Sequence, residues 1–197
     1  MSHTSTLAEK LVDDAYGPLF TYPQRDQTVE KIWAEPDNPA ALEALIDAPE
    51  APVKARFAAA EVLFARDFTF VSRHDASAIA RLYAAALQGK LTGHANAWGL
   101  LWANDTPGEV GGRFIALGKD AIPALRDLLD DRAVVDWYVG SETATVGNGA
   151  KYRIRDFAAF YLSRILRMPI PFHADVAARD AEIAKLVAAL PAPDARR

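Results

Sequence analysis

The chain has 197 residues, of which 51% are hydrophobic and none is cysteine, and its formal net charge is −4. This apolar content is enough for one core without cross-links, so we expect a single domain over residues 1–197. The lack of cysteine excludes disulfides, thiolate metal ligands and a thiol nucleophile, and it favours a reducing compartment. The negative charge argues against a nucleic-acid partner, because that affinity comes from clustered Lys and Arg.

The beginning of the chain does not resemble a secretory signal, because the first thirty residues contain acids and no apolar run. No apolar stretch approaches the roughly 20 residues needed to cross a bilayer. We therefore expect a cytoplasmic protein that does not bind membranes.

Apolar residues recur at helical spacing along nearly the whole chain, which predicts an all-α fold. The first two helices are expected at residues 5–15 and 26–34. Gly17, Pro18 and Pro23 predict a turn region between them.

The next two helices are expected to form a hairpin. Asn38 followed by Pro39 indicates a helix start, because the asparagine can accept from free N–H groups and the proline needs no donor. This helix is expected to end near Pro49. The following segment, residues 53–64, is rich in alanine and predicts a helix that packs closely against it.

Two further helices are predicted from their capping residues. Asp75 can cap a helix that ends at Gly89. Thr92 can cap another, in which Trp98 and Trp102 share one face at i,i+4 spacing. A large aromatic pair at this spacing is typical of a core position.

The next predicted helix has boundary signals at both ends. Thr106 and Glu109 have the spacing of a capping box, in which each side chain satisfies a free backbone donor. Gly118 is expected to end the helix that follows.

The C-terminal part of the sequence predicts three more helical segments. The first two, residues 119–131 and 151–167, are expected to pair as the halves of one hairpin. Asp175 is expected to cap the last helix, which runs to about Leu190, and residues 191–197 predict a flexible tail.

Several of these positions resemble the HEAT-like helical repeat, including the bilin-lyase variety. The residues that carry the resemblance are Leu117-Gly118, Ala121-Ile122-Pro123-Ala124-Leu125, Leu128-Leu129-Asp130, Ile154-Arg155, Ala158-Ala159 and Leu162. It covers about residues 116–166 and is looser over 39–66. It implies a short α-solenoid of antiparallel helix pairs with a concave face, commonly used to bind proteins, although some relatives bind tetrapyrroles and others act on DNA.

Residues 132–150 are longer than the usual connection within a helical hairpin, and long connections are often functional. β-branched and aromatic residues in this segment predict a small β-ribbon or an ordered loop inserted into the solenoid. Gly147-Asn148-Gly149 is expected to supply the positive φ angles needed to re-enter the helix.

Aromatic and ionisable side chains in and around this insertion make up the candidate binding site. Its residues are Asp136, Trp137, Tyr138, Glu142, Tyr152, Arg153, Arg155 and His173. Each has a structural alternative. Arg155 can pair with an aspartate of the paired or neighbouring helix, for which Asp127 and Asp130 are available, and His173 can hold its turn through a backbone hydrogen bond.

The sequence lacks the motifs of several other kinds of functional site. The four histidines show no metal-ligand spacing, so no metal is expected, and no cofactor is predicted. The glycines from Gly108 to Gly112 lack the lysine of a phosphate-binding loop. Ser141 has no histidine at a diagnostic spacing, so nucleophilic catalysis has no support.

The leading hypothesis for function is a binding or scaffold module that engages a protein partner through the concave face and residues 132–150. The alternative is a small-molecule-binding protein or small enzyme, in which the insertion covers a pocket. Whether the protein is an enzyme stays open. Exposed Trp137 and Tyr138 would favour a protein partner, whereas their closure over a cavity would favour a small ligand.

Overall fold

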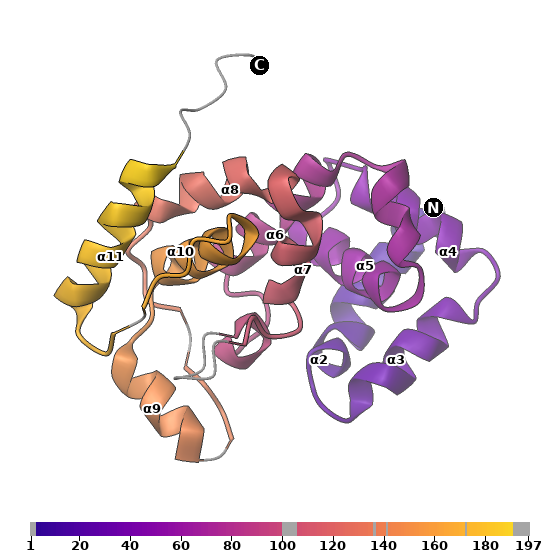
Figure 1. Cartoon of the computed structure of the whole chain (residues 1–197). Coiled ribbons are helices and arrows are strands. Elements are labelled where there is room, and N and C mark those ends of the chain that lie inside the picture. The colour runs from indigo at the N-terminus through magenta and orange to yellow at the C-terminus, as the bar shows by residue number, and fades with distance from the viewer. Residues whose placement is uncertain (1–2, 100–105, 136, 141, 172, 191–197) are drawn as a thin grey trace. The chain divides into compact units, whose positions relative to one another are not determined.

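The computed structural model describes residues 3–99, 106–135, 137–140, 142–171 and 173–190. All secondary-structure elements in these ranges are helices, which confirms the all-α prediction (Figure 1). The chain forms two compact units, Met1–Thr92 and Gly93–Arg197, which are described separately. Within the described ranges, no helix is both long and apolar enough to span a membrane. The single-domain expectation stays a prediction.

The first unit contains six α-helices, one π-helical segment and one 3-10 helix among its described residues. In chain order they are α1 (His3–Lys10), the π-helical η1 (Leu11–Ala15), α2 (Tyr16–Leu19), α3 (Gln24–Trp33), α4 (Asn38–Ile46), α5 (Val53–Arg66), the 3-10 helix η2 (Phe68–Arg73) and α6 (Ala76–Gln88).

Helix α5 forms the centre of the first unit. It packs against α3, α4 and α6, and its closest neighbour is α4. Ala55, Ala58 and Ala59 are fully buried, and their small side chains let the helices approach closely. The predicted α4–α5 hairpin is therefore confirmed.

The buried face of α5 also carries a carboxylate. Glu61 accepts a hydrogen bond from Arg25 at 2.9 Å and another from the Tyr83 hydroxyl, and its side chain is fully buried. A buried charge is costly unless it is paired in this way. Glu61 therefore ties α3 and α6 to α5.

The predicted helix starts in the first unit fare differently. Asp75 caps α6 by accepting from the Ser77 amide, as expected. The predicted helix start at Asn38 and Pro39 is confirmed, because α4 begins at Asn38, but the expected capping role of Asn38 is wrong. Asp37 takes the N-cap position, without a side-chain cap bond. The Asn38 amide instead donates to the Ile32 carbonyl at 2.7 Å, so this asparagine joins α3 to α4.

The second unit has short helices before α9 and longer ones after it. Its described elements are the 3-10 helix η3 (Ala95–Trp98), α7 (Gly111–Leu117), the 3-10 helix η5 (Gly118–Ala121), α8 (Ile122–Asp127), the 3-10 helix η6 (Leu128–Asp130), α9 (Glu142–Ala150), α10 (Ile154–Ile165) and α11 (Val176–Ala189).

Helix α10 forms the centre of the second unit and packs against α7, α8, η6 and α11 (Figure 1). Phe157, Ala158, Ala159 and Leu162 on α10 are fully buried. The predicted pairing of 119–131 with 151–167 is present, although the first partner is divided into η5, α8 and η6.

Helix ends in the second unit follow the sequence signals in part. Gly118 ends α7 with a φ of 60°, and Asp175 caps α11 by accepting from the Ala178 amide at 2.8 Å. The predicted capping box at Thr106 is wrong, because α7 begins only at Gly111 and has no side-chain cap.

The helix expected after Thr92 is also shorter than predicted. Its described part is the 3-10 helix Ala95–Trp98, which follows His94. Trp98 is fully buried, as its aromatic character indicated. The predicted partner Trp102 lies outside the described residues.

The β-ribbon expected at 132–150 is not found. Among the described residues of this segment, β pairing is limited to a single antiparallel bridge between Val134 and Arg153, and 142–150 is the helix α9. Gly147 and Gly149 lie within α9 and do not have positive φ angles. The left-handed residue that ends α9 is Lys151, with a φ of 49°. The described residues of this segment therefore form a loop followed by a helix.

Candidate functional site

The described part of the insertion includes residues 133–135 and 137–140, which we call the strap. Its first residues pair with the segment that leads into α10. The Val135 amide donates to the Tyr152 carbonyl at 3.0 Å, and the Ile154 amide donates to the Ala133 carbonyl at 2.9 Å. These two bonds fix the start of the strap on the helical core.

Two asparagines hold the end of the strap. Asn148 on α9 accepts from the Tyr138 amide at 2.7 Å and donates to the Tyr138 carbonyl at 3.0 Å. Asn96 on η3 makes the same pair of bonds with Val139, both at 2.9 Å. Each asparagine side chain makes the two hydrogen bonds that a neighbouring β-strand would otherwise make. The backbone N–H and C=O groups of Tyr138 and Val139 are therefore all paired.

The Tyr138 side chain anchors the strap in the core. It is 4% exposed, its ring packs edge-on against Tyr152, and its hydroxyl donates to the Gly99 carbonyl at 2.9 Å. Burial raises the pKa of Tyr138 above its ordinary value. Gly147 lets α9 approach the ring, because a Cβ there would lie 2.5 Å from it.

The residues on either side of Tyr138 face solvent. Trp137 is 73% exposed and Val139 is 48% exposed, and Val134 at the start of the strap is 46% exposed. The Trp137 carbonyl nevertheless accepts from the Ala95 amide at 3.1 Å, so its backbone is fixed. The strap therefore presents apolar side chains to water from a backbone that is hydrogen-bonded to its surroundings.

Two of the predicted site residues, Tyr152 and Arg153, are buried beneath the strap. Arg153 binds both carboxylate oxygens of Asp156, at 3.1 and 2.9 Å, and Asp180 on α11 at 2.6 Å. The Asp156 carboxylate also accepts from the Arg153 amide, which caps α10. These bonds join the start of α10 to α11.

A second buried arginine, Arg179 on α11, completes this cluster. Its side chain is fully buried, and its Nε lies 3.6 Å from Asp156 Oδ2. It donates to the Ala150 carbonyl at 2.8 Å and to the His173 carbonyl at 3.2 Å, and it stacks over the Tyr152 ring. Arg179 thus ties the end of α9 and the connector before α11 to the core.

The other predicted site residues do not converge on one point. Arg155 pairs with Asp180 on α11 at 3.4 Å, so it has the structural role predicted for it, with a partner on a neighbouring helix in place of Asp127 or Asp130. His173 is exposed, and its backbone carbonyl accepts the hydrogen bond from Arg179 described above. Asp136 and the Glu142 side chain lie outside the described residues.

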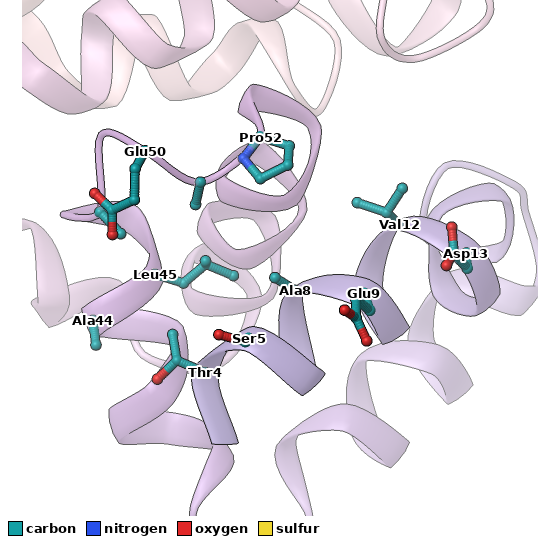
Figure 2. Close-up of a pocket in the computed structure, with 12 residues that line it drawn as sticks. Thr4, Ser5, Ala8, Glu9, Val12, Asp13, Ala44, Leu45, Glu50 and Pro52 are labelled. Atoms are coloured by element: carbon teal, nitrogen blue, oxygen red, sulfur yellow. The ribbon is translucent and has the colours of Figure 1, made fainter. Parts of the chain in front are cut away.

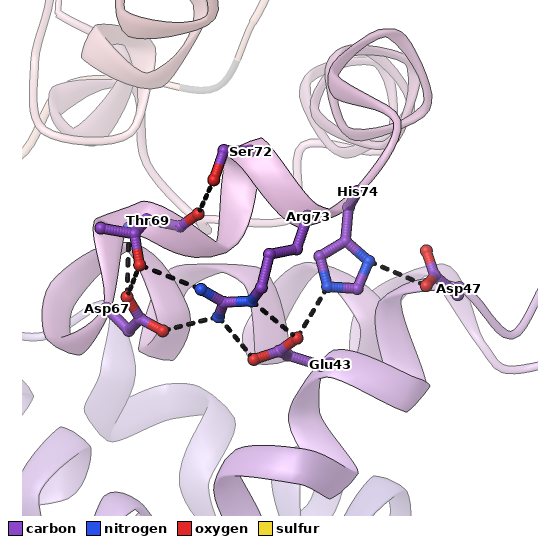
Figure 3. A network of polar contacts seen from close by, with 7 residues as sticks. All are labelled: Glu43, Asp47, Asp67, Thr69, Ser72, Arg73 and His74. Carbon is purple, nitrogen blue, oxygen red and sulfur yellow. Dashed lines mark hydrogen bonds and ion pairs between the residues drawn. The ribbon is translucent and has the colours of Figure 1, made fainter.

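The first unit carries a separate polar network around Arg73 (Figure 3). The Arg73 guanidinium binds Glu43 and Asp67, each at 2.6 Å. His74 lies between two carboxylates, with Nε2 3.0 Å from Glu43 and Nδ1 2.8 Å from Asp47.

This network lacks the geometry of a nucleophilic site. The nearby hydroxyl of Ser72 donates to the Thr69 carbonyl at 2.7 Å, and Figure 3 shows it directed away from His74. A histidine activates a nucleophile only within hydrogen-bond reach. Within the described ranges, no group of three or more His, Asp or Glu side chains is placed to hold a metal ion.

Sequence reasoning missed Asn96 and Asn148, which determine where the strap lies. Asn148 stands between two glycines, a pattern typical of a turn, and nothing in the local sequence marks it as a clamp. Its role depends on Tyr138, ten residues earlier, and became visible only from the fold.

The comparisons with known proteins leave the resemblance to HEAT-like repeats as a prediction. No family model, curated protein or solved structure matches this chain.

Proposed function

We propose that this protein is a helical binding module that engages a protein partner through the strap, with Trp137 as the central anchor. The observation that carries the proposal is the 73% exposure of Trp137 on a backbone that is hydrogen-bonded on both sides. Tryptophan is among the residues that most often dominate binding energy in protein interfaces. The remaining helix pairs, such as α4–α5, belong to the proposed HEAT-like scaffold.

The hydrogen bonds that hold the strap support this proposal. Association loses free energy when mobile loops and side chains must be ordered, so a preformed segment binds more tightly than a flexible one. The bonds from Asn96, Asn148 and Tyr138 hold the strap in place before a partner arrives.

The inner side of the strap favours a protein partner over the small-ligand alternative. A lid over a pocket needs space beneath it, whereas the Tyr138 ring fills this position and contacts Tyr152. The apolar side chains that remain for recognition, Trp137 and Val139, face outward.

The test compares Trp137→Ala with Tyr22→Ala, which removes an aromatic side chain that is 92% exposed in the first unit. Proteins retained by immobilised wild-type chain are identified, and their affinities for the purified variants are measured. We expect Trp137→Ala to weaken binding by more than about 30-fold, the effect of a strong anchor. Tyr22→Ala should bind as the wild type does. Equal binding by wild type and Trp137→Ala would overturn the proposal.

A further inference from the structure

A groove of about 650 Å³ lies in the first unit (Figure 2). One wall is formed by α1 and η1, and the other by the end of α4 and the segment that leads into α5. This volume is within the range of roughly 300–1,000 Å³ typical of ligand sites. The groove involves none of the strap residues, so the inference below does not rest on the proposed function.

The floor of the groove is apolar and includes small side chains. Ala8 and Val12, one helical turn apart, contribute from the first wall, and Leu45 and Ala48 contribute from the second. Figure 2 shows Ala8 and Leu45 between the two walls. Small residues at these positions leave room for larger apolar side chains of a bound molecule.

The rim of the groove is acidic on both sides. Glu9 and Asp13 lie on the first wall, and Glu50 lies on the second (Figure 2). All three are exposed, and none has an ion pair with another described residue. By contrast, Glu35 binds Lys10 at 2.6 Å on the same unit.

The end of α4 does not add to this negative potential. The Ile46 carbonyl accepts from the Arg56 guanidinium at 2.8 and 3.1 Å, and the Leu45 carbonyl accepts from the Ala48 amide at 3.2 Å. The acidic character of the groove therefore comes from the side chains of Glu9, Asp13 and Glu50. The groove therefore combines an apolar floor with a negative rim on each side.

We propose that this groove binds a basic amphipathic helix of a partner protein. The apolar face of such a helix fits the floor, and Lys or Arg side chains on its two flanks reach Glu9 and Asp13 on one wall and Glu50 on the other. The lining positions on α1 and η1 run from Thr4 to Asp13, roughly 13 Å at helical rise, which matches between two and three turns of a bound helix. A small amine would reach the carboxylates of only one wall.

The test uses the full chain and a labelled synthetic helix of about five turns, made of Leu, Ala and Lys with Leu on one face. Fluorescence anisotropy at an ionic strength of about 0.15 M measures the affinity, because charges more than about 8 Å apart are then largely screened. The variant Glu9→Gln/Asp13→Asn/Glu50→Gln is expected to bind the helix about tenfold more weakly than the wild type.

A matched control separates this effect from net charge. Asp26→Asn/Glu30→Gln/Asp37→Asn removes three exposed carboxylates of the same unit that do not line the groove, and it changes the net charge equally. We expect its affinity to stay within about twofold of the wild type, because distant exposed charges are screened. Equal weakening in the two triple variants would overturn the proposal.

The apolar requirement is tested on both molecules. Ala8→Phe fills the floor and is expected to weaken binding of the helix, and an unchanged circular dichroism spectrum shows that the variant is folded. If Ala8→Phe does not fold, the two triple charge variants alone test the proposal. A peptide of the same composition with scrambled order should bind at least about tenfold more weakly than the helix. Equal binding of the scrambled peptide, or displacement of the helix by an equal concentration of hexylammonium, would overturn the proposal.

Discussion

In the first unit Arg73 binds two carboxylates at the surface, whereas in the second unit Arg153 and Arg179 share the carboxylate of Asp156 inside the core. The residue types are the same, but the surroundings differ. The Arg73 side chain is 42% exposed, whereas those of Asp156 and Arg179 are fully buried. Water can replace a lost partner in the first network but not in the second.

This difference in burial predicts that the two networks contribute differently to the free energy of unfolding. Exposed ion pairs typically contribute about 0–1 kcal/mol, because solvent screens them. Removing one partner of a buried pair typically costs about 3–5 kcal/mol, because a charge is left without compensation. The buried cluster therefore holds the second unit together beneath the strap, and the surface network joins η2 to α4 more weakly.

The largest effect is expected from Asp156→Asn. The substitution keeps the volume but removes the charge that faces Arg153 and Arg179, so it should lower the free energy of unfolding by on the order of 3 kcal/mol. Urea unfolding at neutral pH measures the change. Asp180→Asn is the matched control, because this carboxylate is partly exposed and water can replace it; about 1 kcal/mol is expected there. Equal losses would show that burial does not distinguish the two positions.

An intermediate effect is expected from Asn148→Ala, which removes both side-chain bonds to the Tyr138 backbone. Unfolding should become easier by about 1–2 kcal/mol, because buried backbone groups lose their partners. Hydrogen exchange at the Tyr138 and Val139 amides should speed up while exchange in α10 does not. Thr145→Ala, an exposed position on the same helix, is the control. Unchanged exchange in Asn148→Ala would mean that this clamp does not order the strap.

The helix boundaries that sequence predicted correctly are those set by local chemistry. Asp75 and Asp175 cap helices through amides two or three residues away, and Gly118 takes the positive φ that glycine favours. Each of these signals is complete within a few residues. The all-α fold was predictable for a similar reason, since helical spacing is visible along the chain.

The prediction for 142–150 was wrong because tertiary contacts override local preference there. Gly147, Asn148 and Gly149 disfavour a helix, yet Gly147 makes room for the Tyr138 ring and Asn148 binds its backbone. The helix therefore depends on the strap that it clamps.

The candidate site was predictable in part. Trp137 and Tyr138 were both singled out as exposed anchors from their aromatic character in a long insertion. Trp137 is exposed, but the prediction for Tyr138 is wrong, because its side chain is buried against Tyr152. Arg153 was singled out for its position beside the insertion, yet its charge is satisfied by Asp156 and by Asp180, which follows 27 residues later. Such a distant partner leaves no local signal.

The smallest effect is expected from Glu43→Gln in the surface network. Its carboxylate is hydrogen-bonded by Arg73, which holds the pKa of Glu43 below its ordinary value. A lowered pKa means that the contribution of Glu43 to stability is full above the pKa of the unfolded chain, about 4.3, and is lost as the pH falls through the lower pKa of the folded protein. At neutral pH the substitution should therefore cost no more than about 1 kcal/mol.

The pH dependence gives this last prediction its sharpest form. The difference in unfolding free energy between wild type and Glu43→Gln should shrink as the pH falls below about 4, because the protonated Glu43 no longer holds a charge for Arg73. Added salt at neutral pH should shrink it as well, since the pair is partly exposed. Urea unfolding at several pH values and salt concentrations measures both trends. A difference that is large and independent of salt would place Glu43 in the same class as the buried Asp156, and the distinction between the two networks would then be wrong.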